Sequence, residues 1–136
     1  MFSEFSTATR LYDLSWRDSG PEVLVEAWWG HEALSQGFEL CIDALSTDAH
    51  LALKDFLGKS LSLRCALPDG SASTRSGLVR AAFKLGSDGG FTRHRLVVVP
   101  WSWLLTQTRN NRVFQDKSVV QIVDRHLRDV RPLPQR

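Results

Sequence analysis

The four histidines are the first candidates for chemistry, because imidazole serves as a metal ligand and as a general base. They are His31, His50, His94 and His126, and none has the H-x-x-x-H or H-E-x-x-H spacing that brings two imidazoles to one helix face. We therefore expect each to be an ordinary solvated or half-buried side chain. No metal ion and no other cofactor is predicted.

The candidate nucleophiles also lack a catalytic setting. Cys41 and Cys65 lie inside apolar runs without C-x-x-C spacing, which is typical of buried, reduced thiols. No serine has the G-x-S-x-G setting of a nucleophile elbow, and the glycine-rich stretch 86–90 lacks the Lys-Ser/Thr of a phosphate-binding loop. We predict that the chain is not an enzyme and has no small-molecule substrate; a hydrolase is the least supported hypothesis.

Charge and aromatic residues allow a second class of function. Residues 1–58 carry a net charge of −7 and residues 59–136 one of +9, although the whole chain carries only +2. A basic half together with five tryptophans could bind nucleic acid by phosphate attraction and base stacking. The pair Arg109 and Arg112 is the best exposed basic site. Trp29, Trp101 and Trp103 lie in apolar patterns that favour a core role, so a nucleic-acid-binding module is an alternative hypothesis.

Period-two alternation of apolar residues predicts the strands that must position these residues. It is clearest at residues 22–29, 38–44 and 61–67, and it places Trp29 on the core face with Val23 and Val25. Residues 10–16 are predicted as an earlier strand, and residues 77–85 and 91–99 as the strands on either side of the glycine-rich stretch. A five-residue connection, 86–90, is predicted between the last two strands. With 136 residues and an ordinary globular composition, this pattern favours one antiparallel β-barrel domain.

Two or three short helices are predicted at the ends of the strands. Residues 51–57 form a helical turn or two ending at Gly58, and Pro100 begins another turn. The clearest helix begins at Ser118, which can form a capping box with Gln121. Its apolar residues recur with helical spacing, so one face must pack on something. They are Val119, Ile122, Val123, His126 and Leu127.

The ends of the chain bear on localisation. The N-terminus has Glu4 before any basic residue and no apolar block, so no signal peptide is predicted. The most apolar stretch, 96–105, is interrupted by Pro100 and Ser102, so no membrane span is predicted either. A cytoplasmic chain is expected.

Linked motifs carry a specific resemblance. They read LGSDGGF at 85–91, PWSWLL at 100–105 and RVFQDKSV at 112–119, preceded by ALSQ at 33–36, FEL at 38–40 and LGK at 57–59. In order and spacing they resemble the N-terminal region of the Vgr (VgrG) family, the spike proteins of bacterial type VI secretion systems. The resemblance covers about residues 8–128.

The resemblance implies a phage baseplate-hub-like β-barrel domain over residues 8–130. Residues 1–7 and 131–136 are expected to be flexible termini, and the two prolines in 131–136 disfavour a helix there. The resemblance also implies a homotrimeric spike tip that seats on a hexameric tube protein and can be exported through the secretion apparatus, without catalysis. Spike proteins of this family run to several hundred residues, so the rest of the hub and the needle are missing here. A native truncated product, a non-functional remnant and an expressed fragment all remain open.

The motif positions receive structural roles. Gly86, Gly89 and Gly90 turn the hairpin, Ser118 starts the helix, and Phe114 packs beneath it, with Asp116 in the same motif. Trp101, Trp103, Leu104 and Leu105 anchor the far end of the hairpin in the core; alternatively, Trp101 or Phe114 lies in a contact between subunits. Arg109 and Arg112 form a candidate interface, since opposite charges favour the register of head-to-tail contacts. Charge pairing within the barrel is the alternative.

Overall fold

A computed structural model describes residues 10–107, 109 and 111–130 of the chain. The chain divides into two compact units, one ending at Pro100 and one beginning at Trp101. The predicted flexible termini, 1–7 and 131–136, lie outside the described residues.

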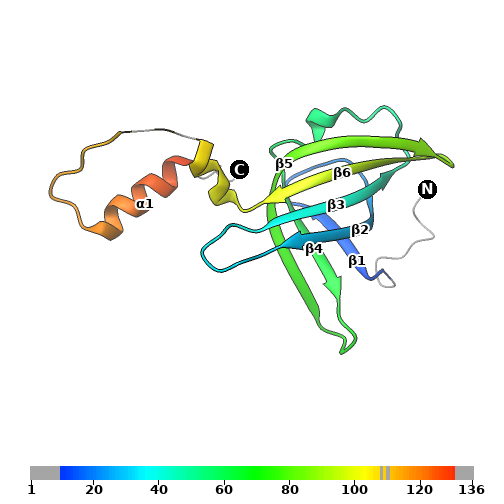
Figure 1. The fold of residues 1–136 in the computed structure, drawn as a ribbon, viewed down its shortest axis with the longest axis horizontal. Helices are drawn as coiled ribbons and strands as arrows, with labels where there is room; N and C mark the ends of the chain where they lie inside the picture. Colours follow the sequence, from blue (N-terminus) through cyan, green and yellow to red (C-terminus); the bar gives the residue numbers. More distant parts are fainter. Residues whose placement is uncertain (1–9, 108, 110, 131–136) are drawn as a thin grey trace. The chain divides into compact units, whose positions relative to one another are not determined.

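The first unit is a curled antiparallel sheet (Figure 1). Its described residues form six strands, which hydrogen-bond in the order β1-β4-β5-β6-β3-β2. The curled sheet makes a half-barrel, and together with short helices and a C-terminal helix it confirms the predicted fold class. The strands are β1 (Tyr12–Trp16), β2 (Leu24–His31), β3 (Glu39–Ser46), β4 (Ser60–Ala66), β5 (Ala72–Asp88) and β6 (Phe91–Val99).

The long strand β5 joins the two halves of this sheet. Residues 72–78 pair with β4 and residues 78–88 pair with β6, with a register shift between Val79 and Ala81. Such a bulge bends a strand and increases its twist, which lets the sheet curl. The curl brings the two end strands close together. Tyr12 of β1 meets Trp28 of β2 edge to face, with 6.3 Å between ring centroids.

The core lies on the concave face of the half-barrel. Apolar residues of β3, β4 and β6 alternate into it, as period-two patterning requires. Phe56 enters from the connection between β3 and β4, directly after the 3-10 helix η2 (Leu53–Asp55), and is fully buried. Its ring lies 6.1 Å from that of Trp16 and 5.2 Å from that of His94. Phe56 therefore plugs the half-barrel between β1 and β6.

Three expectations about side-chain placement or turn length are wrong. Trp29 is 46% exposed, and Trp28 packs against the core instead, because a register shift between Val25 and Ala27 reverses the alternation. His94 is only 1% exposed, since β6 directs it inward beside Leu96. The last hairpin has no five-residue connection: β5 continues to Asp88, and only two glycines separate it from β6.

Those two glycines explain the short turn. Gly89 and Gly90 have φ angles of 57° and 83°, and a two-residue turn with positive φ at both positions matches the twist of the flanking strands. Gly86 lies within β5 at a second register shift, between Lys84 and Gly86. The glycine-rich stretch therefore includes both a bulge and a turn.

The second unit contains the 3-10 helix η3 (Trp101–Gln107) and the helix α1 (Val119–Val130). The capping box is confirmed: the Ser118 amide donates to Gln121 Oε1 at 3.0 Å, and the Gln121 amide donates to Ser118 Oγ at 3.3 Å. Val119 and Val123 on the expected apolar face remain exposed. No helix in the described part of the chain is long and apolar enough to span a membrane.

Candidate assembly surface

The convex side of β2, β3, β6 and β5 carries an unusual mixture of charged and aromatic side chains. Since Leu96 and Ile42 point into the core, their strand neighbours point outward. We call this region the outer sheet surface and define it by seven residues: Glu26, Trp29, Asp43, Phe83, Phe91, Arg93 and Arg95.

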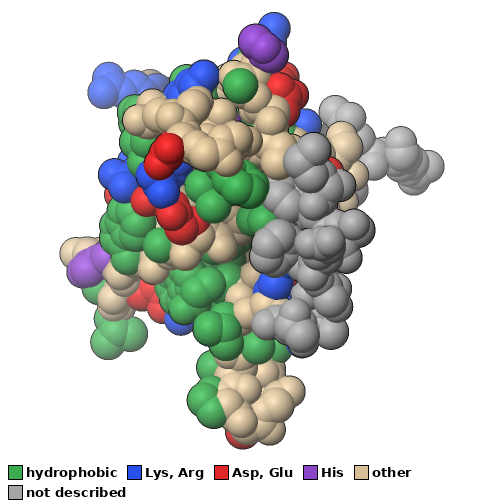
Figure 2. Space-filling view, turned by 90° about the vertical axis from the view of Figure 1, so that its right-hand side faces the viewer, with side chains coloured by type: hydrophobic (Ala, Val, Ile, Leu, Met, Phe, Trp, Pro, Cys, Tyr) green, Lys and Arg blue, Asp and Glu red, His purple; other side chains and the backbone are tan. Residues whose placement is uncertain are grey.

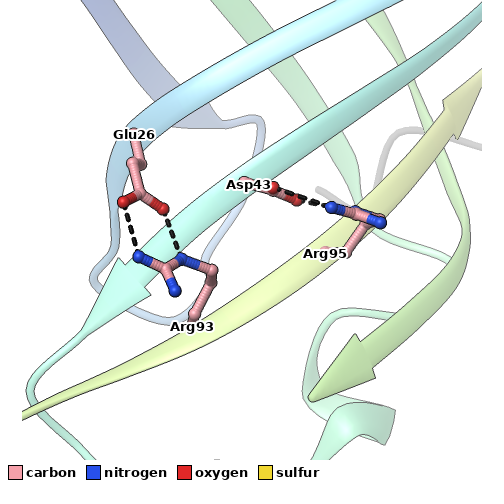
Figure 3. A network of polar contacts seen from close by, with 4 residues as sticks. All are labelled: Glu26, Asp43, Arg93 and Arg95. Atoms are coloured by element: carbon pink, nitrogen blue, oxygen red, sulfur yellow. Dashed lines mark hydrogen bonds and ion pairs between the residues drawn. The ribbon is translucent and has the colours of Figure 1, made fainter. Parts of the chain in front are cut away.

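Arg93 connects strand β6 to the end strand β2. Its Nε and Nη2 atoms donate to the two carboxylate oxygens of Glu26 at 2.5 and 2.6 Å (Figure 3). Because β3 lies between β6 and β2 in the sheet, the Arg93 side chain crosses over β3 to reach its partner. This two-point geometry fixes the orientation of both groups.

Arg95 forms a second connection beside the first. It donates to both carboxylate oxygens of Asp43, at 2.8 and 2.9 Å, directly across the β3–β6 ladder (Figure 3). Its guanidinium carbon also lies 4.8 Å from the ring centroid of Trp29 on β2, within the range of cation–π attraction. Three strands are thus linked through one arginine.

The pairing changes the electrostatics of the surface. The hydrogen bond from Arg93 lowers the pKa of Glu26, and the same contact raises the pKa of Arg93. The hydrogen bond to Asp43 likewise raises the pKa of Arg95. These shifts favour the charged forms of Glu26, Arg93 and Arg95. The formal charges of the two arginines and their two carboxylate partners sum to zero.

Replacing Asp43 by Asn tests the strength of this arrangement. Asp43 is only 8% exposed, so Asp43→Asn removes a buried ionic partner while keeping the side-chain shape. We expect the free energy of unfolding to fall by about 1–2 kcal/mol, less than for a fully buried pair because solvent screens the partly exposed Arg95. Urea unfolding followed by tryptophan fluorescence measures the change.

Glu39→Gln is the matched control for this substitution. Glu39 pairs with Arg80 at 3.0 Å, but the Glu39 side chain is half exposed. We expect Glu39→Gln to lower the free energy of unfolding by less than about 1 kcal/mol. If both substitutions lowered the free energy of unfolding equally, the Asp43–Arg95 pair would stabilise the protein no more than the exposed Glu39–Arg80 pair, which would contradict this prediction.

Apolar side chains remain exposed next to these neutral pairs. Phe83 and Phe91 are 51% and 36% exposed on β5 and β6. A groove of about 230 Å³ lies close by, lined by Leu45, Gly86, Ser87, Asp88, Phe91 and Arg93. On the face shown in Figure 2, hydrophobic side chains reach the surface in patches beside clustered basic and acidic groups. Exposed apolar area of this kind favours contact with another protein.

The structure places the other predicted site residues in the second unit. Trp101 is exposed, whereas Trp103, Leu104 and Leu105 are half-buried, and none of the described η3 residues belongs to the buried core. Ser118 caps α1, as described above. Asp116 has a positive φ of 53° just before it.

Phe114 is half-buried beside the C-terminal helix. It lines a groove of about 490 Å³ together with Arg112, Val113, Gln115, Lys117, Arg125 and Asp129. Arg112 forms an ion pair with Asp129 within this unit. Both candidate interface arginines, Arg109 and Arg112, are exposed.

Pairing inside the sheet accounts for part of the charge asymmetry in the sequence. In the described sheet unit, four ion pairs join an acidic residue of the first half to an arginine of the second half. The pairs are Glu32–Arg75, Glu39–Arg80, Glu26–Arg93 and Asp43–Arg95. The structure thus supports charge pairing within the barrel at these residues.

Sequence reasoning missed the central residues of the outer sheet surface, although one signal was present. The stretch Arg93-His94-Arg95-Leu96 alternates charged and buried positions, so strand periodicity alone places both arginines on one face. Their partners are 67 and 52 residues away, and only the strand order identifies them. Across the described residues, no group of three His, Cys, Asp or Glu side chains could hold a metal ion.

Comparison with known proteins adds an independent line of evidence. Residues 31–136 match the model of a family described as phage tail baseplate hub (GPD). Two similar proteins of Pseudomonas aeruginosa are the type VI secretion system spike proteins VgrG1a and VgrG1c, 34% and 35% identical over 82% and 93% of this chain. The chain spans only 17% of the length of either relative.

A solved structure shares the fold. The E. coli c3393 protein, described as a type VI secretion component with structural similarity to the T4 bacteriophage tail proteins gp27 and gp5, superposes with a TM-score of 0.69. The match has 28% sequence identity and covers 86% of this chain and 32% of that protein.

Proposed function

Because the chain belongs to the phage tail baseplate hub (GPD) family, we propose that it is a structural component of a type VI secretion spike and acts by assembly. Its similarity to the two VgrG proteins confirms the resemblance to Vgr spike proteins. The proposed hub-like domain covers residues 8–130, with the half-barrel as its main scaffold.

The outer sheet surface is the observation that carries this proposal. Its four charges neutralise one another through two-point ion pairs, while Phe83 and Phe91 beside them remain exposed. A rigid, neutral surface with aromatic side chains can bury area against a protein without leaving a charge unpaired. Proposed partners are further copies of a spike protein and the hexameric tube protein.

The same surface argues against nucleic acid as the partner. Arg93 and Arg95 are the arginines of β6, and both are engaged by carboxylates. A phosphate would have to displace Glu26 or Asp43 to bind them. Arg95 lies over one face of the Trp29 ring, and Trp28 packs against the core, so stacking by both side chains is restricted. Retention of an oligonucleotide at low salt, lost steeply as salt rises, would reverse this preference.

Co-elution tests the assembly function directly. The purified chain is mixed at low salt with the hexameric tube protein or with a full-length spike protein and separated by size, with molar mass measured by light scattering. We expect co-elution with at least one of them. Failure with both partners would contradict the proposal.

A double substitution tests the contribution of the outer sheet surface. Phe83→Ser with Phe91→Ser removes two exposed aromatic side chains, so it should weaken co-assembly at least about tenfold while the unfolding midpoint changes little. Leu67→Ser is the matched control, because Leu67 is 42% exposed after β4, outside this surface. Co-assembly that survives the double substitution would exclude this surface as the contact.

We also propose that the chain is made in the cytoplasm and exported through the type VI apparatus as part of the spike. The two relatives are type VI secretion system spike proteins, which supports this localisation. The proposal includes no catalytic step.

A further inference from the structure

A buried histidine at one end of the half-barrel has no role in the outer sheet surface. His94 lies on the concave face of β6, opposite Ala44 of β3 and Lys84 of β5, and is 1% exposed. Neither ring nitrogen has a hydrogen-bond partner in the described part of the chain. Buried polar groups are normally hydrogen-bonded, so the imidazole of His94 is buried without the hydrogen bonds that would compensate its lost hydration.

The ring of His94 supports the Phe56 plug. The two ring centroids lie 5.2 Å apart, and Phe56 is fully buried between His94 and Trp16. Residues 47–59, which we call the plug segment, are tied to β5 by two backbone hydrogen bonds, Gly58 to Val79 and Val79 to Lys59. The Phe56 side chain is what fills the end of the half-barrel.

The charges around His94 oppose a positive ring. On β5, Lys84 is the charged group that affects His94, and it donates to the Ala49 carbonyl of the plug segment at 3.2 Å. On β6, Arg93 and Arg95 point to the convex face and are paired there. On β3, Ala44 and Ser46 face the concave side, and Lys54 and Asp55 beside Phe56 are exposed.

We propose that His94 is an acid-sensitive latch: when its ring takes up a proton, the Phe56 plug leaves the end of the half-barrel and the plug segment opens. A buried cation next to Lys84, without a carboxylate among the groups that affect it, is destabilised relative to a hydrated one. Opening the plug segment lets water reach the ring. The latch depends only on this chain and works without an assembly partner.

The direction of the effect follows from proton binding. Burial and the nearby Lys84 lower the pKa of His94 in the closed state below its usual value of 6.5, which the ring regains on opening. The open state therefore binds more protons as the pH falls below 6.5, and opening becomes more favourable. Above that pH the ring is neutral in both states, so the closed state has its full stability.

Hydrogen exchange read by mass spectrometry tests the latch on the whole chain. Exchange of the plug segment is compared at about pH 7.5 and about pH 5, after correction for the intrinsic rate. Acid should lower the protection of the plug segment, by at most about thirtyfold at pH 5 because the open ring has its usual pKa. His94→Leu, similar in volume and unable to titrate, should abolish this acid effect. His50→Gln is the matched control, because His50 is an exposed histidine of the same segment and should leave the acid effect unchanged.

A titration of the unsubstituted chain keeps the proposal testable if His94→Leu fails to fold. The NMR signal of the His94 ring should titrate below 6.5, and plug-segment resonances should change with the same midpoint. Protection that does not change with acid, or His94 signals that titrate without any change in the plug segment, would overturn the latch.

Discussion

Phe56→Ala is expected to lower the free energy of unfolding of the sheet unit by about 3–5 kcal/mol, the largest stability effect of any substitution considered. Phe56 is fully buried, and its ring is the contact that joins Trp16 of β1 to His94 of β6. These strands are separated by β4 and β5 in the sheet order, so no strand pairing can replace the contact. The measurement is urea unfolding followed by tryptophan fluorescence.

Leu57→Ala is the control for the plug. Leu57 is the next residue in the chain and is 46% exposed, so its truncation should cost less than about 1 kcal/mol. If the two substitutions were equally mild, the end of the half-barrel would collapse onto the lost volume, and Phe56 would not be the plug described here.

Gly77→Ala has the second largest expected effect on stability, a loss of about 3 kcal/mol, at the upper end of the overpacking range. A Cβ atom at Gly77 would lie 2.6 Å from Val98 Cγ1 and 2.7 Å from the Val99 carbonyl oxygen. The first contact can relax through a side-chain rotation, but the second is with backbone of β6. Either β5 or β6 must shift where β5 passes from pairing with β4 to pairing with β6.

Ser76→Ala separates this steric effect from a general sensitivity of β5. Ser76 is exposed, and its hydroxyl meets that of Ser62 at 2.7 Å, so its loss should cost about 0.5 kcal/mol or less. Thermal unfolding of both variants beside the unsubstituted chain makes the comparison. A Gly77→Ala chain as stable as Ser76→Ala would mean that β5 and β6 can separate there without cost.

The sequence predicted much of this architecture because most of its strands have one clear apolar face. Residues 38–44, 61–67 and 91–99 alternate as their strands do, and Ser118 caps α1 as its spacing with Gln121 indicates. The first part of β5 is not predicted because residues 72–76 are all small or polar and show no apolar alternation. Gly89 and Gly90 marked the hairpin, but the bulge at Gly86 hid its true length.

The errors share a physical cause. A bulge adds one residue to a strand, so every side chain beyond it lies on the opposite face from the one that simple alternation predicts. The sequence around Glu26 shows no local sign of the bulge there. The alternation therefore predicts Trp29 in the core, whereas the structure places it under Arg95 on the outer sheet surface. The outer sheet surface needed the strand order as well, because β3 separates the strands that Arg93 and Glu26 occupy.

The two arginines that cross or contact β3 also determine how the sheet responds to mechanical load. A slip of β2 along β3 by two residues would keep the inward and outward faces but would carry Glu26 out of reach of Arg93 and Trp29 away from Arg95. Backbone hydrogen bonds can re-form after such a slip, whereas two-point ion pairs cannot. A pull along the strands is therefore shared between β2, β3 and β6, so this edge of the half-barrel resists shear.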